Sequence, residues 1–224
     1  MREGEASVFI RFFLVYLFFN LNIVYALTYV YTGHCAYEGP IECFQKELKV
    51  HDAELNKVYQ DHLSNSGSAK LKQAERFWIK YKEADCNFFG SEVQGGRYYE
   101  LVYYVCLINK TKNRINDLQS PLSYGGCALK KGYNDIASCL DNELKRYDTE
   151  LSRLYIPVSG DNLLKKAEYS WIKFKDADCN YIASKISKSK EYMIVNSACL
   201  INRTKERVKE ENISLFVKNW FKDY

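Results

Sequence analysis

The fold is decided by a stretch that occurs twice, LKQAERFWIKYKEADCNF at residues 71–88 and LKKAEYSWIKFKDADCNY at residues 164–181. The two copies lie 93 residues apart and align without a gap. In each copy the apolar residues recur at spacings of three and four, which is typical of one stripe of a helix. These residues are Leu71, Ala74, Trp78 and Tyr81 in the first copy, and Leu164, Ala167, Trp171 and Phe174 in the second.

The similarity continues on both sides of this stretch. Downstream, CLINKTKNR at residues 106–114 returns as CLINRTKER at residues 199–207, at the same offset. Upstream, Cys43 and Tyr59 match Cys139 and Tyr155 at an offset of 96 residues. The change of offset falls in a connection, where an altered loop length costs little. The chain is therefore a tandem duplication.

Each copy contains two further helical patterns. Leu48, Leu55, Val58 and Tyr59 indicate a helix before the repeated stretch, and Tyr99, Val102, Tyr103, Cys106 and Ile115 indicate one after it. Three helices joined by short loops predict a small antiparallel bundle. The fold class is all-α, with two tandem three-helix antiparallel bundles, each linked by disulfides.

The boundary between the copies lies near residues 119–126, where Pro121 cannot continue a helix and Gly125 and Gly126 supply a flexible joint. The predicted organisation has four parts. They are a signal peptide at 1–26, the first helical domain at 27–120, the second at 126–210 and a C-terminal tail at 211–224.

The N-terminus has the pattern of an export signal. Arg2 and Arg11 precede the apolar run at residues 12–19, and Val24-Tyr25-Ala26 places small residues where a signal peptidase requires them. The alternative is an uncleaved anchor, since Val8–Tyr31 is nearly long enough to span a bilayer, although polar residues interrupt it. We expect cleavage after Ala26 and a periplasmic or secreted protein, which would touch a membrane only if this segment stays attached.

All eight cysteines follow the signal segment, and none forms a C-x-x-C pair. An even number of cysteines in an oxidising compartment indicates disulfides rather than a metal site. Four cysteines in each copy allow three connectivities. The pairing that closes the most local loops is favoured, and a Cys43–Cys86 link would contradict it. The favoured pairs are Cys35–Cys43, Cys86–Cys106, Cys127–Cys139 and Cys179–Cys199.

Several function classes are disfavoured by the composition. A formal net charge of +4 is too mild for a nucleic-acid footprint. His34, His51 and His62 lack the spacing of metal ligands, and no nucleophile elbow or phosphate-binding glycine loop is present. Cysteines held in disulfides cannot act as nucleophiles. We therefore expect no enzyme activity, no cofactor and no metal.

Together these pieces resemble the LprI-type lysozyme inhibitor family. The resemblance rests on an early cysteine pair, DAELNKVY at residues 52–59, the helix from Ala74 to Cys86, the Gly95-Gly96 loop, Cys106 and TKNR at residues 111–114. Both copies match. The resemblance implies an exported protein that binds other proteins, with lysozyme or another cell-wall hydrolase as the partner. The alternative is a structural or adaptor protein of the cell envelope without inhibitory activity.

The best candidate for a recognition element is the loop at residues 88–97 of the first copy. Loops carried on a rigid scaffold often bind partners, and glycine permits close approach to a cleft. A plain helix connection that needs glycine for its turn is the competing interpretation. The predicted partner-binding residues are Glu92, Gly95, Gly96 and Arg97. The second copy replaces the glycine pair with a basic stretch at residues 184–190.

Two pairs of equivalent residues have a structural and a functional interpretation. Trp78 and Trp171 could anchor a partner, but their place on the apolar stripe favours core packing. Asp85 and Asp178 could bind an arginine of a partner. We favour an ion pair within each domain, with Arg114 or Arg207 as the partner and a role in stability.

Overall fold

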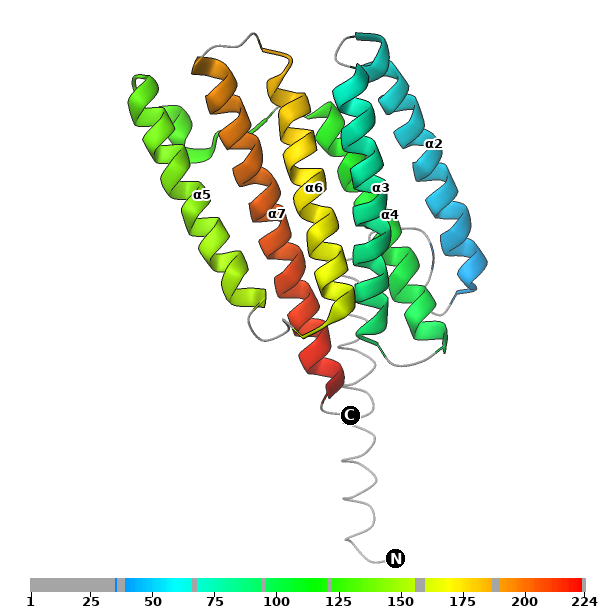
Figure 1. Cartoon of the computed structure of the whole chain (residues 1–224). Helices are drawn as coiled ribbons and strands as arrows, with labels where there is room; N and C mark the ends of the chain where they lie inside the picture. Colours follow the sequence, from blue (N-terminus) through cyan, green and yellow to red (C-terminus); the bar gives the residue numbers. More distant parts are fainter. Residues whose placement is uncertain are drawn as a thin grey trace, which may run out of the picture.

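The computed structural model describes residues 35, 39–65, 68–93, 96–120, 122–155, 160–186 and 190–222, which form an all-helical body (Figure 1). No strand is present in these parts of the chain. The predicted signal peptide at residues 1–26 and its cleavage site lie outside the described residues. Within the described ranges, the all-α prediction is confirmed.

Each copy consists of three long helices, as the repeat predicts. The first copy comprises α2 (Ile41–Asn65), α3 (Ser68–Ser91) and α4 (Gly96–Gln119). After the short 3-10 helix η1 (Gly125–Leu129), the second copy comprises α5 (Tyr133–Tyr155), α6 (Asn162–Ala183) and α7 (Lys190–Lys222). The helix α7 is 33 residues long, so the backbone of residues 211–222 continues it without a break.

Local signals account for the joints between these helices. Asp161 caps α6, because its Oδ1 accepts hydrogen bonds from the backbone N–H groups of Leu163 at 2.7 Å and Leu164 at 3.1 Å. Gly125 opens η1 with a φ of 54°, which a residue with a side chain rarely adopts. The predicted linker is therefore a structured connection in the part that the structure describes.

The helices are arranged with approximate two-fold symmetry about the centre of the molecule. In Figure 1, α3 and α6 lie antiparallel and side by side, with α4 and α2 beyond α3 and with α7 and α5 beyond α6. The contact between α3 and α6 is the most extensive of any helix pair. The repeated stretch that decides the fold thus also joins the two copies.

The largest hydrophobic cluster is shared by both copies. Tyr81 and Phe174 occupy equivalent positions, and their rings stack with centroids 5.7 Å apart. Trp78 and Trp171 are each only 4% exposed, which confirms the core interpretation for both. The other buried members of the cluster are Leu55, Val58, Leu71, Ile115, Leu118, Leu151, Tyr181 and Val208. A separated copy would expose these aromatic surfaces to water.

All four favoured disulfides are present. Cys35–Cys43 and Cys86–Cys106 brace the first copy, and Cys127–Cys139 and Cys179–Cys199 brace the second. The Cys86–Cys106 and Cys179–Cys199 links each span 20 residues and tie the second helix of a copy to its third. No cysteine is free. The disulfides thus cross-link each copy only within itself, although the two copies share one hydrophobic cluster.

Among the described helices, none combines the length and the low polarity that crossing a membrane would require.

Candidate functional site

The loop singled out by the sequence joins α3 to α4 at one end of the molecule (Figure 1). The backbone N–H groups of Glu92 and Val93 donate hydrogen bonds of 3.3 Å to carbonyl oxygens in the last turn of α3. The Val93 side chain is buried, whereas that of Glu92 is half-buried. These contacts hold the first part of the loop against the bundle.

The second part of the loop is less fully described. Gly95 and the side chain of Arg97 lie outside the described residues, and Gly96 is the first residue of α4. The structure places Glu92 and Gly96 at the two ends of one short connection. The binding role of all four predicted residues stays a prediction.

The base of this loop is clamped by tyrosine. The Tyr99 hydroxyl of α4 donates a 2.8 Å hydrogen bond to Oδ1 of Asn87 on α3. The same ring lies so close to Gly90 that an added Cβ would come within 2.8 Å of its Cε2 atom. In the second copy, Tyr192 makes the equivalent 3.1 Å bond to Asn180. The clamp and the adjacent disulfide give the loop a fixed platform.

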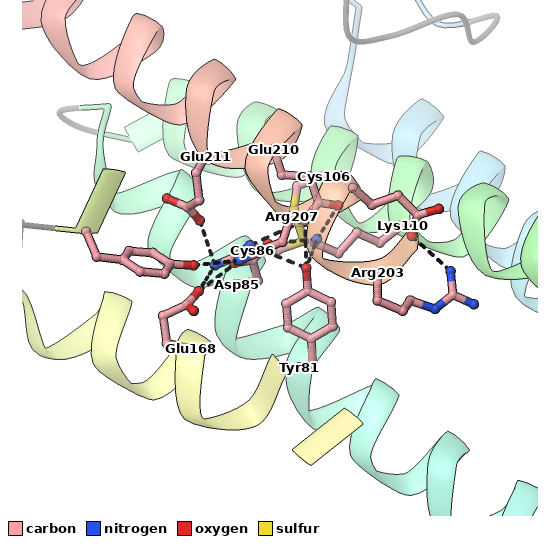
Figure 2. Close-up of polar contacts among 12 residues, drawn as sticks. Tyr81, Asp85, Cys86, Cys106, Lys110, Glu168, Arg203, Arg207, Glu210 and Glu211 are labelled. Carbon is pink, nitrogen blue, oxygen red and sulfur yellow. Dashed lines mark hydrogen bonds and ion pairs between the residues drawn. A yellow bond between two sulfur atoms is a disulfide. The ribbon is translucent and has the colours of Figure 1, made fainter. Parts of the chain in front are cut away.

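A second feature, which was not predicted from the sequence, is a buried charge cluster between the two copies (Figure 2). Asp85 and Asp178 are both fully buried and lie on α3 and α6. Four basic residues, on α4 and α7, bind them and six further carboxylates. The basic residues are Lys110, Arg114, Arg203 and Arg207, and the other carboxylates belong to Glu75, Asp117, Glu168, Glu206, Glu210 and Glu211.

Each buried aspartate binds one base from its own copy and one from the other. Asp85 contacts Lys110 at 2.8 Å within the first copy and Arg207 of the second copy at 2.6 Å. Asp178 repeats the arrangement with Arg203 at 2.9 Å and Arg114 of the first copy at 2.8 Å. The ion pairs therefore cross the interface in both directions.

This crossing corrects the predicted pairing of the aspartates. Arg114 contacts Asp178 instead of Asp85, and Arg207 contacts Asp85 instead of Asp178. The prediction of a pair within each domain was wrong because each arginine side chain extends across the interface to the aspartate of the other copy. Inside its own copy, each arginine binds a glutamate about two turns into the repeated helix, Glu75 for Arg114 and Glu168 for Arg207. The structural role favoured for both aspartates is consistent with their burial.

Additional contacts cross the interface around the aspartates. Glu210 of α7 accepts hydrogen bonds from Lys110 at 2.8 Å and from the Tyr81 hydroxyl at 2.7 Å. Arg203 of α7 contacts Asp117 of α4 at 2.7 Å. Buried charges are costly unless each one is paired, and this network pairs them by contacts within each copy together with four ion pairs between the copies.

The cluster contains more carboxylates than basic groups, and the pKa of each carboxyl depends on its burial and on the charges next to it. Burial raises the pKa of the Glu211 carboxyl to about 7, although Arg207 lies only 2.6 Å away, because nearby carboxylates add to the effect. Burial also raises the pKa of Asp178, but Arg114 and Arg203 outweigh it, so that its pKa lies below the ordinary value. Asp178 therefore stays ionised, whereas Glu211 titrates near neutral pH.

Two clefts adjoin the cluster. A narrow one, of about 40 Å³, lies between α4 and α7 on the two-fold axis, with Trp78 and Trp171 in its lining. A wider one, of about 480 Å³, lies beside the connection between the copies and includes Ser120, Ser123 and Lys185. Apart from Lys185, whose ammonium lies over the Tyr181 ring, the charged side chains that line the clefts belong to the charge cluster.

The described residues offer no constellation for metal binding. No group of histidine, cysteine and acidic side chains in this part of the chain could hold a metal ion. His62 contacts the Tyr181 hydroxyl at 3.3 Å across the copies, so it too belongs to the interface. What the geometry provides is a stiff scaffold with a clamped loop at one end.

The comparisons with known proteins agree with the repeat. The family model described as "Lysozyme inhibitor LprI" matches twice, at residues 35–118 and 127–211. An uncharacterized protein of Rhizobium meliloti (strain 1021) is 28% identical over 93 residues, which covers 34% of this chain and 67% of that protein. No solved structure matches. Because the family model covers most of the chain and matches once per copy, this protein belongs to the LprI lysozyme inhibitor family.

Proposed function

We propose that this protein is exported and binds a protein partner, a lysozyme or a related cell-wall hydrolase, and inhibits it. The observation that carries the proposal is the family match, which covers both copies and nearly all of the described helices. Four disulfides support export, because such bonds persist in oxidising compartments. The site is a binding surface and performs no chemistry of its own.

The loop between α3 and α4 is the proposed contact with the partner. It is anchored by the Tyr99–Asn87 bond and by the Cys86–Cys106 disulfide at its base. Anchoring the base of a loop reduces the conformational entropy that is lost on binding, which favours affinity. Glu92, Gly95, Gly96 and Arg97 are the proposed contact residues.

The test is a hydrolysis assay with the oxidised protein and a panel of lysozymes and other cell-wall hydrolases. Stoichiometric inhibition of at least one hydrolase is the expected result, and it should be lost on reduction of the disulfides. If the protein captures envelope proteins but inhibits no hydrolase at any ratio, an adaptor role replaces the proposal.

The repeat supplies a matched control for the loop. Arg97→Ala in the first copy should weaken inhibition, whereas Lys190→Ala at the equivalent position of the second copy should not. Both variants should melt at the temperature of the parent protein, since each lies at the start of a helix beyond the shared core. Equal losses of inhibition in both variants would contradict the assignment of the first-copy loop.

A further inference from the structure

The outer side of α3 and α6 is uncovered by any other described helix. Residues of both α4 and α7 line the narrow cleft whose lining includes Trp78 and Trp171, so both helices lie on the same side of the central pair. The opposite side of α3 and α6 carries the exposed positions of these two helices. In Figure 1 the two helices run next to each other along the middle of the molecule, so their exposed positions on this side are neighbours.

This surface is strongly basic. The exposed charged side chains of α3 and α6 are seven basic and only two acidic, Glu83 and Asp176. The other carboxylates of these helices point inward, to the buried charge cluster. We call six of the basic residues the basic face: Lys72, Arg76 and Lys80 on α3, with Lys165, Lys166 and Lys173 on α6.

Apolar side chains lie among these cations. Ile79 and Ile172 occupy equivalent positions and are 44% and 45% exposed, and Tyr169 is 65% exposed. What distinguishes them from exposed apolar residues elsewhere, such as Val50 on α2, is that they lie on the same two helices as the exposed cations.

The outermost helices have the opposite charge balance. α2 and α5 each contain five acidic residues against three lysines or arginines. The mild positive charge of the chain is therefore unevenly distributed, with an excess of basic residues among the exposed side chains of the central pair and an excess of acidic residues on α2 and α5. Such an uneven distribution of charge orients a protein in front of a charged surface.

We propose that the basic face docks on the surface of an anionic phospholipid bilayer. Lysine and arginine stems can extend to the lipid phosphates, while isoleucine and tyrosine side chains enter the interfacial layer. A soluble polyanion would use the cations but would gain little from exposed isoleucines. The α3–α4 loop lies at the helix ends, so a docked molecule still presents it to a partner.

The test is co-sedimentation of the oxidised protein with vesicles at low salt. Vesicles of phosphatidylcholine with about 30 mol% phosphatidylglycerol should bind it, because each basic residue near such a surface is worth about a fivefold gain in partitioning. Pure phosphatidylcholine vesicles should not. Added salt should release the protein from the anionic vesicles.

Matched double variants identify the face. Lys80→Glu with Lys173→Glu should weaken vesicle binding at least about tenfold. Lys49→Glu with Lys57→Glu on α2 alters the net charge equally and should weaken it far less. Ile79→Ser with Ile172→Ser should also weaken binding.

Three outcomes would overturn the proposal. They are no binding to anionic vesicles, equal losses in the two charge-reversed variants, and full binding by the isoleucine variant, which would indicate a site for a soluble polyanion. Hydrolase inhibition without lipid should be unchanged in the Lys80→Glu, Lys173→Glu variant. Membrane docking and inhibition can therefore fail independently.

Discussion

The crossed ion pairs predict that Asp178→Ala will destabilise both copies at once. Asp178 is fully buried between Arg114 of the first copy and Arg203 of the second, at 2.8 and 2.9 Å. Its removal leaves two buried guanidinium groups, each with one acidic partner fewer. Arg114 would keep Glu75, and Arg203 would keep Asp117.

Removing one partner of a buried ion pair costs about 3–5 kcal/mol. That is a large share of a total stability of about 5–15 kcal/mol. For a chain of this size, each kcal/mol lowers the melting temperature by about 2–4 °C, so we expect a fall of roughly 6–20 °C. Asp176→Ala is the matched control. This aspartate lies two residues away on the exposed side of α6, and its loss should change stability by less than about 0.5 kcal/mol.

Thermal unfolding by circular dichroism measures the total effect, and hydrogen exchange with mass spectrometry assigns it to each copy. Peptides from α3 and α4 should lose protection together with those from α6 and α7. In the double variant with Arg114→Met, the loss should be smaller than the sum of the two single losses. If exchange accelerated only in the second copy, or if stability fell no more than in the control, the reasoning from crossed pairs would be refuted.

Three further predictions concern the cluster, the disulfides and the interface. The raised pKa of Glu211, about 7 against an ordinary 4.5, means that the folded protein keeps a proton that the unfolded chain releases. Stability should therefore fall as the pH rises from about 4.5 to about 7, by at most about 3 kcal/mol. Glu211→Gln should flatten this part of the stability curve in urea titrations, and an unchanged slope would exclude Glu211 as its cause. Replacing both cysteines of Cys86–Cys106 by serine should cost about 3 kcal/mol in urea unfolding. The same change at Cys179–Cys199, which also spans 20 residues, should cost about as much, whereas a clear inequality would show that loop closure does not set the cost. Residues 27–120 alone should self-associate, because Trp78 and Tyr81 lose their cover; light scattering that found a stable monomer would contradict a shared core.

Much of the fold could be predicted from the sequence because the duplication shows each helical pattern twice. The apolar stripe of Leu71, Ala74, Trp78 and Tyr81 is buried as predicted. The four local disulfides also form, since short loops close most readily. For α4 the helix was predicted correctly, and Ile115 of its pattern is buried. The rest of the pattern is only half-buried, and the other apolar residues on the buried side include Leu101, Val105 and Ile108. Tyrosine combines an apolar ring with a polar hydroxyl, so periodicity alone does not show whether it is buried.

The interface between the copies could not be predicted in the same way. Periodicity reports which side of a helix is buried but not which helix covers it. The sequence is compatible with an ion pair between Asp85 and Arg114 within the first copy. Because the second copy carries the same residue types, a pair between Asp85 and Arg207 is equally compatible with the sequence, and this is the pair that forms. One signal was available in retrospect. Lys110, Arg114, Arg203 and Arg207 fall on two helices that also carry cysteines and apolar residues, and so many cations on a packed helix require buried acids.

Joining the two halves in one polypeptide has a consequence when the protein is dilute. Two separate subunits with this interface would come apart as they became dilute, since their association depends on concentration. A covalent connection such as residues 120–132 keeps the halves at an effective concentration in the millimolar range, however dilute the surroundings. It also frees the two halves to change separately, so that one end of the molecule can keep a glycine loop while the other end carries lysines.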